Sequence, residues 1–173
     1  MTNSPVTSPF GIRRAGVSAS RSYVTLGAGS DIFAVEVEYV REILGLRSIK
    51  PLPNGPEFLA GLIDVRGDIV PVIDLRIKLG MAPRTEAASE STRILVLDLI
   101  IGGQPEVLGL MADQVFEVTE MRIDEMKNMP EFGTHWDSKY IKGICPRSNE
   151  FIIVFNLEKL FSDSDISTIK NIA

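Results

Sequence analysis

Short apolar runs separated by turn-forming residues account for most of the chain. Runs rich in Val, Ile and Leu recur at 23–26, 32–35, 59–65, 69–75, 93–101, 106–112, 115–121, 140–145 and 151–155. Runs of this length bounded by glycine, proline and polar clusters are typical of β-strands. Helical spacing is confined to short segments, namely 38–44 (a helical turn or a bent strand), 74–80, 157–161 and the residues after 162. The pattern therefore predicts an all-β fold with short helices.

The clearest local prediction is a β-hairpin formed by residues 59–65 and 69–75. Residues 66–68 (Arg-Gly-Asp) join the two runs, and Gly67 is expected to supply the positive φ that a tight turn needs. Pro71 lies inside the second run and cannot donate a backbone hydrogen bond. We therefore expect this strand to lie at a sheet edge or to be bulged at Pro71.

The hairpin block recurs later in the chain, which indicates an internal duplication. An offset of 82 positions aligns Gly61 with Gly143, and it aligns Asp74, the expected cap of a short helix, with Asn156. An offset of 75 aligns residues 35–43 with 110–118. The alternative is that any two hairpins share such a pattern. A duplication predicts two similar five-stranded barrels.

The chain divides by composition into one folded region and two ends. Residues 1–20 are small and polar, which favours a disordered N-terminal tail. Within the folded region, 21–165, the small and polar residues 81–92 are expected to link a first subdomain (22–80) to a second (93–162). Residues 163–173 are expected to form a C-terminal tail or a short helix.

Composition excludes several classes of protein. The 173 residues carry a net charge of −5, which argues against nucleic-acid binding, because phosphate recognition requires a basic surface. No run reaches the ~18 apolar residues that a membrane-spanning helix needs, so we expect no membrane insertion. Cys145 is the only cysteine, and no secretion signal begins the chain, so a cytoplasmic location is expected.

Catalytic and metal-binding patterns are missing. His135 is the only histidine, and Cys145 precedes a proline at a predicted strand end, where a structural role is the usual one. The acidic residues near the hairpin, Asp64, Asp68 and Asp74, are expected to face different sides of two strands rather than to share a metal ion. We therefore expect no enzyme activity, no cofactor and no metal.

Arg66 at the hairpin tip is the one candidate recognition residue. Its planar guanidinium can hold a carboxylate through two hydrogen bonds, which suits the binding of another protein. The alternative is that Arg66 is satisfied by its neighbours Asp64 and Asp68.

At this hairpin the sequence resembles a known family. Residues 58–76 (Phe-Leu-Ala-Gly-Leu-Ile-Asp-Val-Arg-Gly-Asp-Ile-Val-Pro-Val-Ile-Asp-Leu-Arg) resemble the signature block of the CheW family, which couples chemoreceptors to a histidine kinase in bacteria. Residues 40–43, 109–115 and 152–161 resemble three further family segments. The resemblance extends over about 22–162.

The resemblance implies a fold of two SH3-like five-stranded β-barrels and an adaptor without catalysis. It implies two partners, the regulatory domain of a CheA-type histidine kinase and the cytoplasmic tip of a chemoreceptor, in arrays at the inner membrane. Arg66, Glu42 and Val40 match family positions for receptor coupling. Gly61 and Gly67 match structural glycines of the hairpin.

Departures from the family pattern leave the particular partner open. Asp64 replaces the usual Asn, Val65 replaces Leu, and Asn156 replaces the closing Asp. We expect that an aspartate at position 64 can pair with Arg66 and so change the hydrogen bonds that this arginine can form with a receptor. Alternative functions are a coupling protein of a pilus-motility or other chemosensory-like pathway, and a small-molecule-binding β-barrel.

Overall fold

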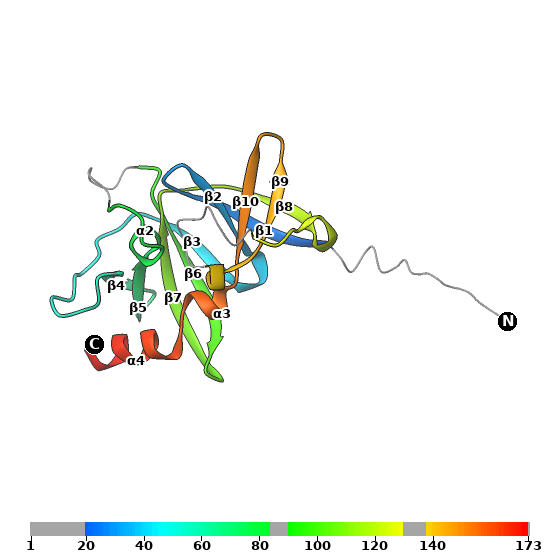
Figure 1. Ribbon diagram of the computed structural model, residues 1–173. Helices are drawn as coiled ribbons and strands as arrows, with labels where there is room; N and C mark the ends of the chain where they lie inside the picture. Colours follow the sequence, from blue (N-terminus) through cyan, green and yellow to red (C-terminus); the bar gives the residue numbers. More distant parts are fainter. Residues whose placement is uncertain (1–19, 84–89, 130–137, 173) are drawn as a thin grey trace.

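The computed structural model describes residues 20–83, 90–129 and 138–172, which form two curled five-stranded sheets (Figure 1). The strands are β1 (Ser20–Ala28), β2 (Asp31–Glu36), β3 (Val40–Gly45), β4 (Leu59–Val65), β5 (Asp68–Asp74), β6 (Arg93–Ile101), β7 (Gln104–Ala112), β8 (Gln114–Arg122), β9 (Ile141–Arg147) and β10 (Glu150–Phe155). The first sheet has the order β8-β1-β2-β10-β9, and the second has the order β3-β6-β7-β5-β4. The all-β prediction with two five-stranded units is confirmed.

The helices are few and short. They are η1 (Val37–Tyr39), α2 (Leu75–Lys78), η2 (Ile123–Glu125), η3 (Ser138–Tyr140), α3 (Leu157–Leu160) and α4 (Asp163–Ile172), where η marks a 3₁₀ helix. The segment expected to be a helical turn or a bent strand contains both, since η1 leads directly into β3. In the described part of the chain, no helix is long and apolar enough to cross a membrane. Of the expected tail, 1–20, residues 1–19 lie outside the described residues and Ser20 begins β1; half of the expected linker, residues 84–89, also lies outside them.

Each sheet takes strands from both halves of the chain. The hairpin β1–β2 is joined by β8, β9 and β10, and the hairpin β6–β7 is joined by β3, β4 and β5. The chain therefore changes sheets at η1, after β2, and again between β7 and β8. The expected division into consecutive subdomains, 22–80 and 93–162, does not separate the two sheets. The exchange is reciprocal and gives both sheets the same topology, which agrees with an internal duplication.

The main hydrophobic core lies between the two sheets. Phe33 of β2 and Phe155 of β10 stack there with ring centroids 4.8 Å apart, beside the fully buried Leu95, Leu97 and Leu110. A smaller core lies inside the curl of each sheet: Tyr23, Ala34, Met121, Cys145, Ile152 and Val154 in the first, and Ile63, Val65, Val70, Val72, Ile94, Val96 and Met111 in the second. Because each buried aliphatic or aromatic side chain contributes about 1.5–3 kcal/mol, these three cores hold the curled sheets together.

The expected position of Pro71 at a sheet edge is wrong. Its strand, β5, lies inside the second sheet, between β7 and β4. The ladder to β7 begins only at Val72, so it does not need an N–H from Pro71. Opposite Pro71, Leu62 exchanges both backbone hydrogen bonds with Lys50. The register shift in this hairpin lies between Leu59 and Gly61 instead of at Pro71. A proline is tolerated here because neither neighbouring strand requires its missing donor.

An ion pair joins the two sheets next to this hairpin. Asp74 caps α2 by accepting a hydrogen bond from Arg76 N at 3.0 Å. The Arg76 guanidinium reaches Asp113, between β7 and β8, with its Nη2 2.9 Å from the carboxylate. The same carboxylate accepts from the N–H of Gly29, in the β1–β2 turn, at 2.7 Å. Asp113 therefore ties both sheets together at the second chain crossing.

The C-terminal helix α4 is held against the second sheet by a nearly buried ion pair. Lys78 Nζ lies 2.8 Å from Asp165 Oδ2, and their side chains are 9% and 17% exposed. The ammonium also lies 4.5 Å from the centre of the Phe58 ring, within the range of a cation–π contact. Asp165 accepts from the N–H of Ser162, whose hydroxyl accepts from the N–H of Asp165, so that both residues cap the helix.

This ion pair makes the docking of α4 depend on pH. Burial by itself raises the pKa of Asp165, but hydrogen bonds from Lys78 and from the N–H of Ser162 outweigh it and lower the pKa below its ordinary value. A carboxyl whose pKa is lowered in the folded state stabilises that state above its unfolded pKa of about 3.9, and this contribution is lost as the pH falls through the folded value. We expect Asp165→Asn to cost about 1.5–3 kcal/mol at pH 7.

The check is urea unfolding of the wild type and of Asp165→Asn between pH 7 and roughly pH 3. The difference in free energy of unfolding should shrink steadily as the pH falls. Asp124→Asn is the matched control, because Asp124 pairs with Arg122 on an exposed surface. A difference for Asp165→Asn that stays constant across this range would rule out the charge as its cause.

Candidate functional site

The hairpin tip between β4 and β5 presents Arg66 to solvent. Arg66 and Gly67 both have positive φ, 52° and 91°, as a two-residue type I′ turn requires. Asp64 Oδ1 accepts a hydrogen bond from the N–H of Gly67 at 2.7 Å and so fixes the turn from within. A positive φ at the non-glycine Arg66 was not anticipated from the sequence.

Arg66 forms an ion pair with Glu42 of β3 rather than with Asp64 or Asp68. Arg66 Nη1 donates to Glu42 Oε2 in a short contact. The expectation that Asp64 pairs with Arg66 is therefore wrong, because the Asp64 carboxylate is engaged by the backbone of the turn. β3 and β4 are the two edge strands of the second sheet, so the pair connects its two edges where the sheet curls round.

The ion pair is asymmetric in its exposure. The Arg66 side chain is 76% exposed, whereas that of Glu42 is 19% exposed. The hydrogen bond from Arg66 lowers the pKa of Glu42, and the same bond raises the pKa of Arg66. Both groups therefore stay charged at neutral pH. A guanidinium has five N–H donors and the Arg66 side chain is 76% exposed, so the arginine can bind a carboxylate of a partner while it keeps Glu42.

The third predicted residue, Val40, lies at the start of the same strand as Glu42. It is partly buried and packs against the core between the sheets. Val40 therefore connects the start of the Glu42 strand to the core between the two sheets. The structure brings Glu42 and Arg66 together and places Val40 two residues away along β3.

Other residues around the ion pair were not predicted. Ile43 follows Glu42 on the opposite face of β3, Leu46 lies just beyond the strand, and their side chains are 41% and 42% exposed. Arg41 forms a two-bond pair with Asp98 of β6, at 3.0 and 2.6 Å. We call Glu42, Ile43, Leu46 and Arg66 the coupling surface. The sequence predicted a helical turn or a bent strand here, and neither showed which side chains would be exposed.

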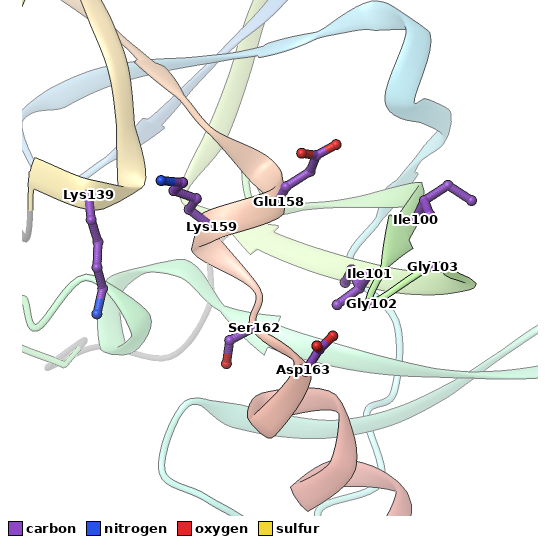
Figure 2. A pocket seen from close by; sticks show the side chains of 9 residues that line it. All are labelled: Ile100, Ile101, Gly102, Gly103, Lys139, Glu158, Lys159, Ser162 and Asp163. Atoms are coloured by element: carbon purple, nitrogen blue, oxygen red, sulfur yellow. The ribbon is translucent and has the colours of Figure 1, made fainter.

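A separate pocket of about 620 Å³ lies at the β6–β7 turn (Figure 2). Figure 2 shows Lys139 and Lys159 on one side of it and Asp163 beside Gly102 on the other. A Cβ on Gly102 would lie 2.2 Å from an oxygen of Asp163, so α4 begins in close contact with this turn. The hydroxyl of Ser162 in the pocket caps α4 by accepting from the N–H of Asp165, and it lies 3.0 Å from the hydroxyl of Ser164. The pocket therefore lies where the start of α4 packs against the β6–β7 turn.

Comparisons of the sequence and of the fold with known proteins point to one family. The family model of the CheW-like domain matches residues 22–165. The chain belongs to the CheW-like domain family. A chemotaxis protein CheW of Klebsiella aerogenes is 28% identical over 92% of both chains, and one of Treponema pallidum is 24% identical over 86% of both. The crystal structure of the scaffolding protein TtCheW from Thermoanaerobacter tengcongensis superimposes with a TM-score of 0.73, at 29% identity, over 84% of this chain and 90% of that one.

The composition of the coupling surface fits membership of the CheW-like family. The family consists of non-catalytic scaffold proteins, and the coupling surface is made of a charged pair and exposed aliphatic side chains. Such a combination of arginine and apolar groups is suited to protein recognition. In the described part of the chain, no three His, Cys, Asp or Glu side chains are grouped to hold a metal ion.

Proposed function

We propose that this chain is an adaptor of chemotaxis signalling that couples chemoreceptors to a CheA-type histidine kinase without chemistry of its own. The observation that carries the proposal is the Glu42–Arg66 ion pair at an exposed hairpin tip, in a chain of the CheW-like family. The curated relatives, which are chemotaxis proteins CheW, support the pathway.

In this proposal the cytoplasmic tip of the receptor binds at the coupling surface and near Val40. Arg66 supplies a charge-assisted hydrogen bond, and Ile43 and Leu46 supply apolar contact at 41% and 42% exposure. The regulatory domain of the kinase binds elsewhere on the two sheets, so both partners are held at once. The complex forms in the cytoplasm, in arrays at the inner membrane.

Reconstitution tests this function directly. Receptor-containing membranes and the cognate CheA-type kinase are mixed with increasing amounts of this chain, and kinase autophosphorylation is measured. We expect the chain to raise kinase activity about tenfold or more, and receptor ligand to reverse the increase. No stimulation, in spite of correct folding by circular dichroism, would contradict the proposal.

A binding measurement separates the two partner sites. Isothermal titration with the isolated regulatory domain of the kinase should give a dissociation constant unaffected by Arg66→Ala. Receptor-containing membranes should lose most of their affinity for the same variant. Equal losses for both partners would show that Arg66 belongs to a shared surface.

A further inference from the structure

A hollow lies beside the pair of parallel strands in each of the two sheets. The hollow of the first sheet has a volume of about 570 Å³, and its walls include Asp31 and Ile32 of β2 and Glu150 and Ile152 of β10. The hollow of the second sheet has a volume of about 520 Å³, and its walls include Glu106 and Val107 of β7 and Asp68 and Val70 of β5. Both combine acidic and β-branched residues.

The two hollows are equivalent positions of the duplicated fold. The 82-residue offset places Asp68 and Val70 on Glu150 and Ile152. The parallel ladders agree, because Val72 pairs with Gly109 in one sheet and Val154 pairs with Ala34 in the other. Counting back two and three residues along β7 and β2 places Val107 on Ile32 and Glu106 on Asp31. The same four positions therefore line both hollows.

In the second sheet, an amphipathic helix of the chain itself forms one wall of the hollow. Ile166 and Ile169 of α4 are 8% and 4% exposed and face the hollow. The next residue, Lys170, places its Nζ 2.8 Å from Glu106 Oε2. The helix thus contributes two aliphatic side chains, three residues apart, and one basic side chain to the wall of this hollow. Figure 1 shows α4 on the side of β4 and β5.

In the first sheet, the described residues that line the equivalent hollow belong to strands and to the β1–β2 turn. Its apolar walls are Ile32, Ile152 and Phe116 of β8, and the Phe116 side chain packs over Gly27 while remaining 48% exposed. Its charged walls are Asp31, Glu117, Glu150 and Arg147, which together are acidic. An apolar hollow with an acidic rim complements a helix that carries aliphatic and basic residues.

We propose that the hollow of the first sheet binds an amphipathic helix of a partner protein, which presents two aliphatic side chains three residues apart, followed by a basic residue directed at Asp31. The pattern is the one that α4 presents to the equivalent hollow. Helix-in-groove recognition uses such i, i+3 anchors. The hollow lies on the first sheet, whereas the coupling surface lies on the second, so this proposal does not depend on the proposed receptor contacts.

A peptide with the sequence of residues 162–172 is the probe. Because an isolated helix of this length is barely stable in water, the peptide is held helical by a side-chain lactam on its polar face. Its binding to the full chain is followed by fluorescence anisotropy, and the site is located by NMR shift changes. We expect saturable binding, with shifts in β2, β8 and β10, and weaker binding when the lysine of the peptide is replaced by glutamate.

Two variants of β8 make the test specific. Phe116→Ser should weaken peptide binding about tenfold or more, because it removes the largest apolar wall. Val118→Ser is the matched control, since Val118 is 63% exposed on the same strand but does not line the hollow. Absence of saturable binding, equal effects of both variants, or shifts confined to β5 and β7, where the peptide would have displaced α4, would each overturn the proposal.

Discussion

Gly61→Ala is expected to destabilise the protein by about 3–5 kcal/mol, at the upper end of what a single substitution does. A Cβ at this position would lie 2.2 Å from the carbonyl oxygen of Lys50 and 2.7 Å from Ile49 Cγ2. The Lys50 backbone cannot move away without breaking hydrogen bonds, because it exchanges two, of 2.9 and 2.8 Å, with Leu62, the residue after Gly61. The φ of 149° adds strain for any residue with a side chain. Urea unfolding gives the free energy that tests this value.

Two other glycines of the same sheet serve as controls for Gly61. Gly67 has a φ of 91° but open space around it, so Gly67→Ala should cost only the backbone strain of about 1–2 kcal/mol. Gly45 ends β3 with nothing within 4 Å of the added Cβ, so Gly45→Ala should change stability by about 0.5 kcal/mol or less. Similar losses for Gly61→Ala and Gly67→Ala would refute the steric explanation.

Local features of the fold followed from local sequence. The glycine before each hairpin turn aligned in the two repeats, and the structure gives the reason. Gly61 precedes Leu62, which bridges to Lys50, and Gly143 precedes Ile144, which bridges to Lys127. A side chain at either glycine would collide with the bridging segment. The duplication was therefore detectable because the same close approach occurs in both sheets.

The exchange of strands between the sheets was not predictable in the same way. The apolar pattern of β3 shows that one face of it is buried, but both sheets offer a hairpin edge of equal topology. The sheet that β3 joins depends on two chain crossings. One is η1, which turns the chain after β2, and the other is at Asp113, which follows β7 and joins Arg76 and Gly29. These are long-range contacts, and no window of neighbouring residues contains them.

The Glu42–Arg66 pair illustrates the same limit at the candidate site. Both residues were singled out through the family resemblance, yet the sequence offered Asp64 and Asp68 as nearer partners for the arginine. In the structure, Asp64 accepts a hydrogen bond from Gly67 and Arg66 has a positive φ, and the arginine pairs with Glu42 instead. Ser148 has a φ of 50° at the equivalent turn of the other repeat, so the turn conformation belongs to the fold rather than to arginine.

Arg66→Glu is expected to reduce receptor-dependent kinase activation about tenfold or more, with little change in stability. The substitution removes the guanidinium that a receptor carboxylate would bind and places two carboxylates, at 42 and 66, next to each other. Arg66 is 76% exposed, and surface ion pairs of this kind contribute little to folding. Arg122→Glu is the matched control, because Arg122 is also exposed and paired with an acidic neighbour, Asp124. Kinase activity in the reconstituted receptor mixture is the measurement.

The charge-swapped double variant Glu42→Arg/Arg66→Glu separates binding from local structure. It restores an ion pair between β3 and the hairpin tip but leaves a carboxylate, not a guanidinium, at the more exposed end. If Arg66 binds a receptor carboxylate, the double variant should remain as defective as Arg66→Glu, since charge reversal at a recognition point is repulsive. Lys142→Arg/Glu36→Asp, which keeps every charge at a pair on the other sheet, should activate the kinase normally. Recovery of activation by the double variant would show that Arg66 only holds Glu42 and the curl of the sheet in place, and would move the receptor contact elsewhere on the coupling surface.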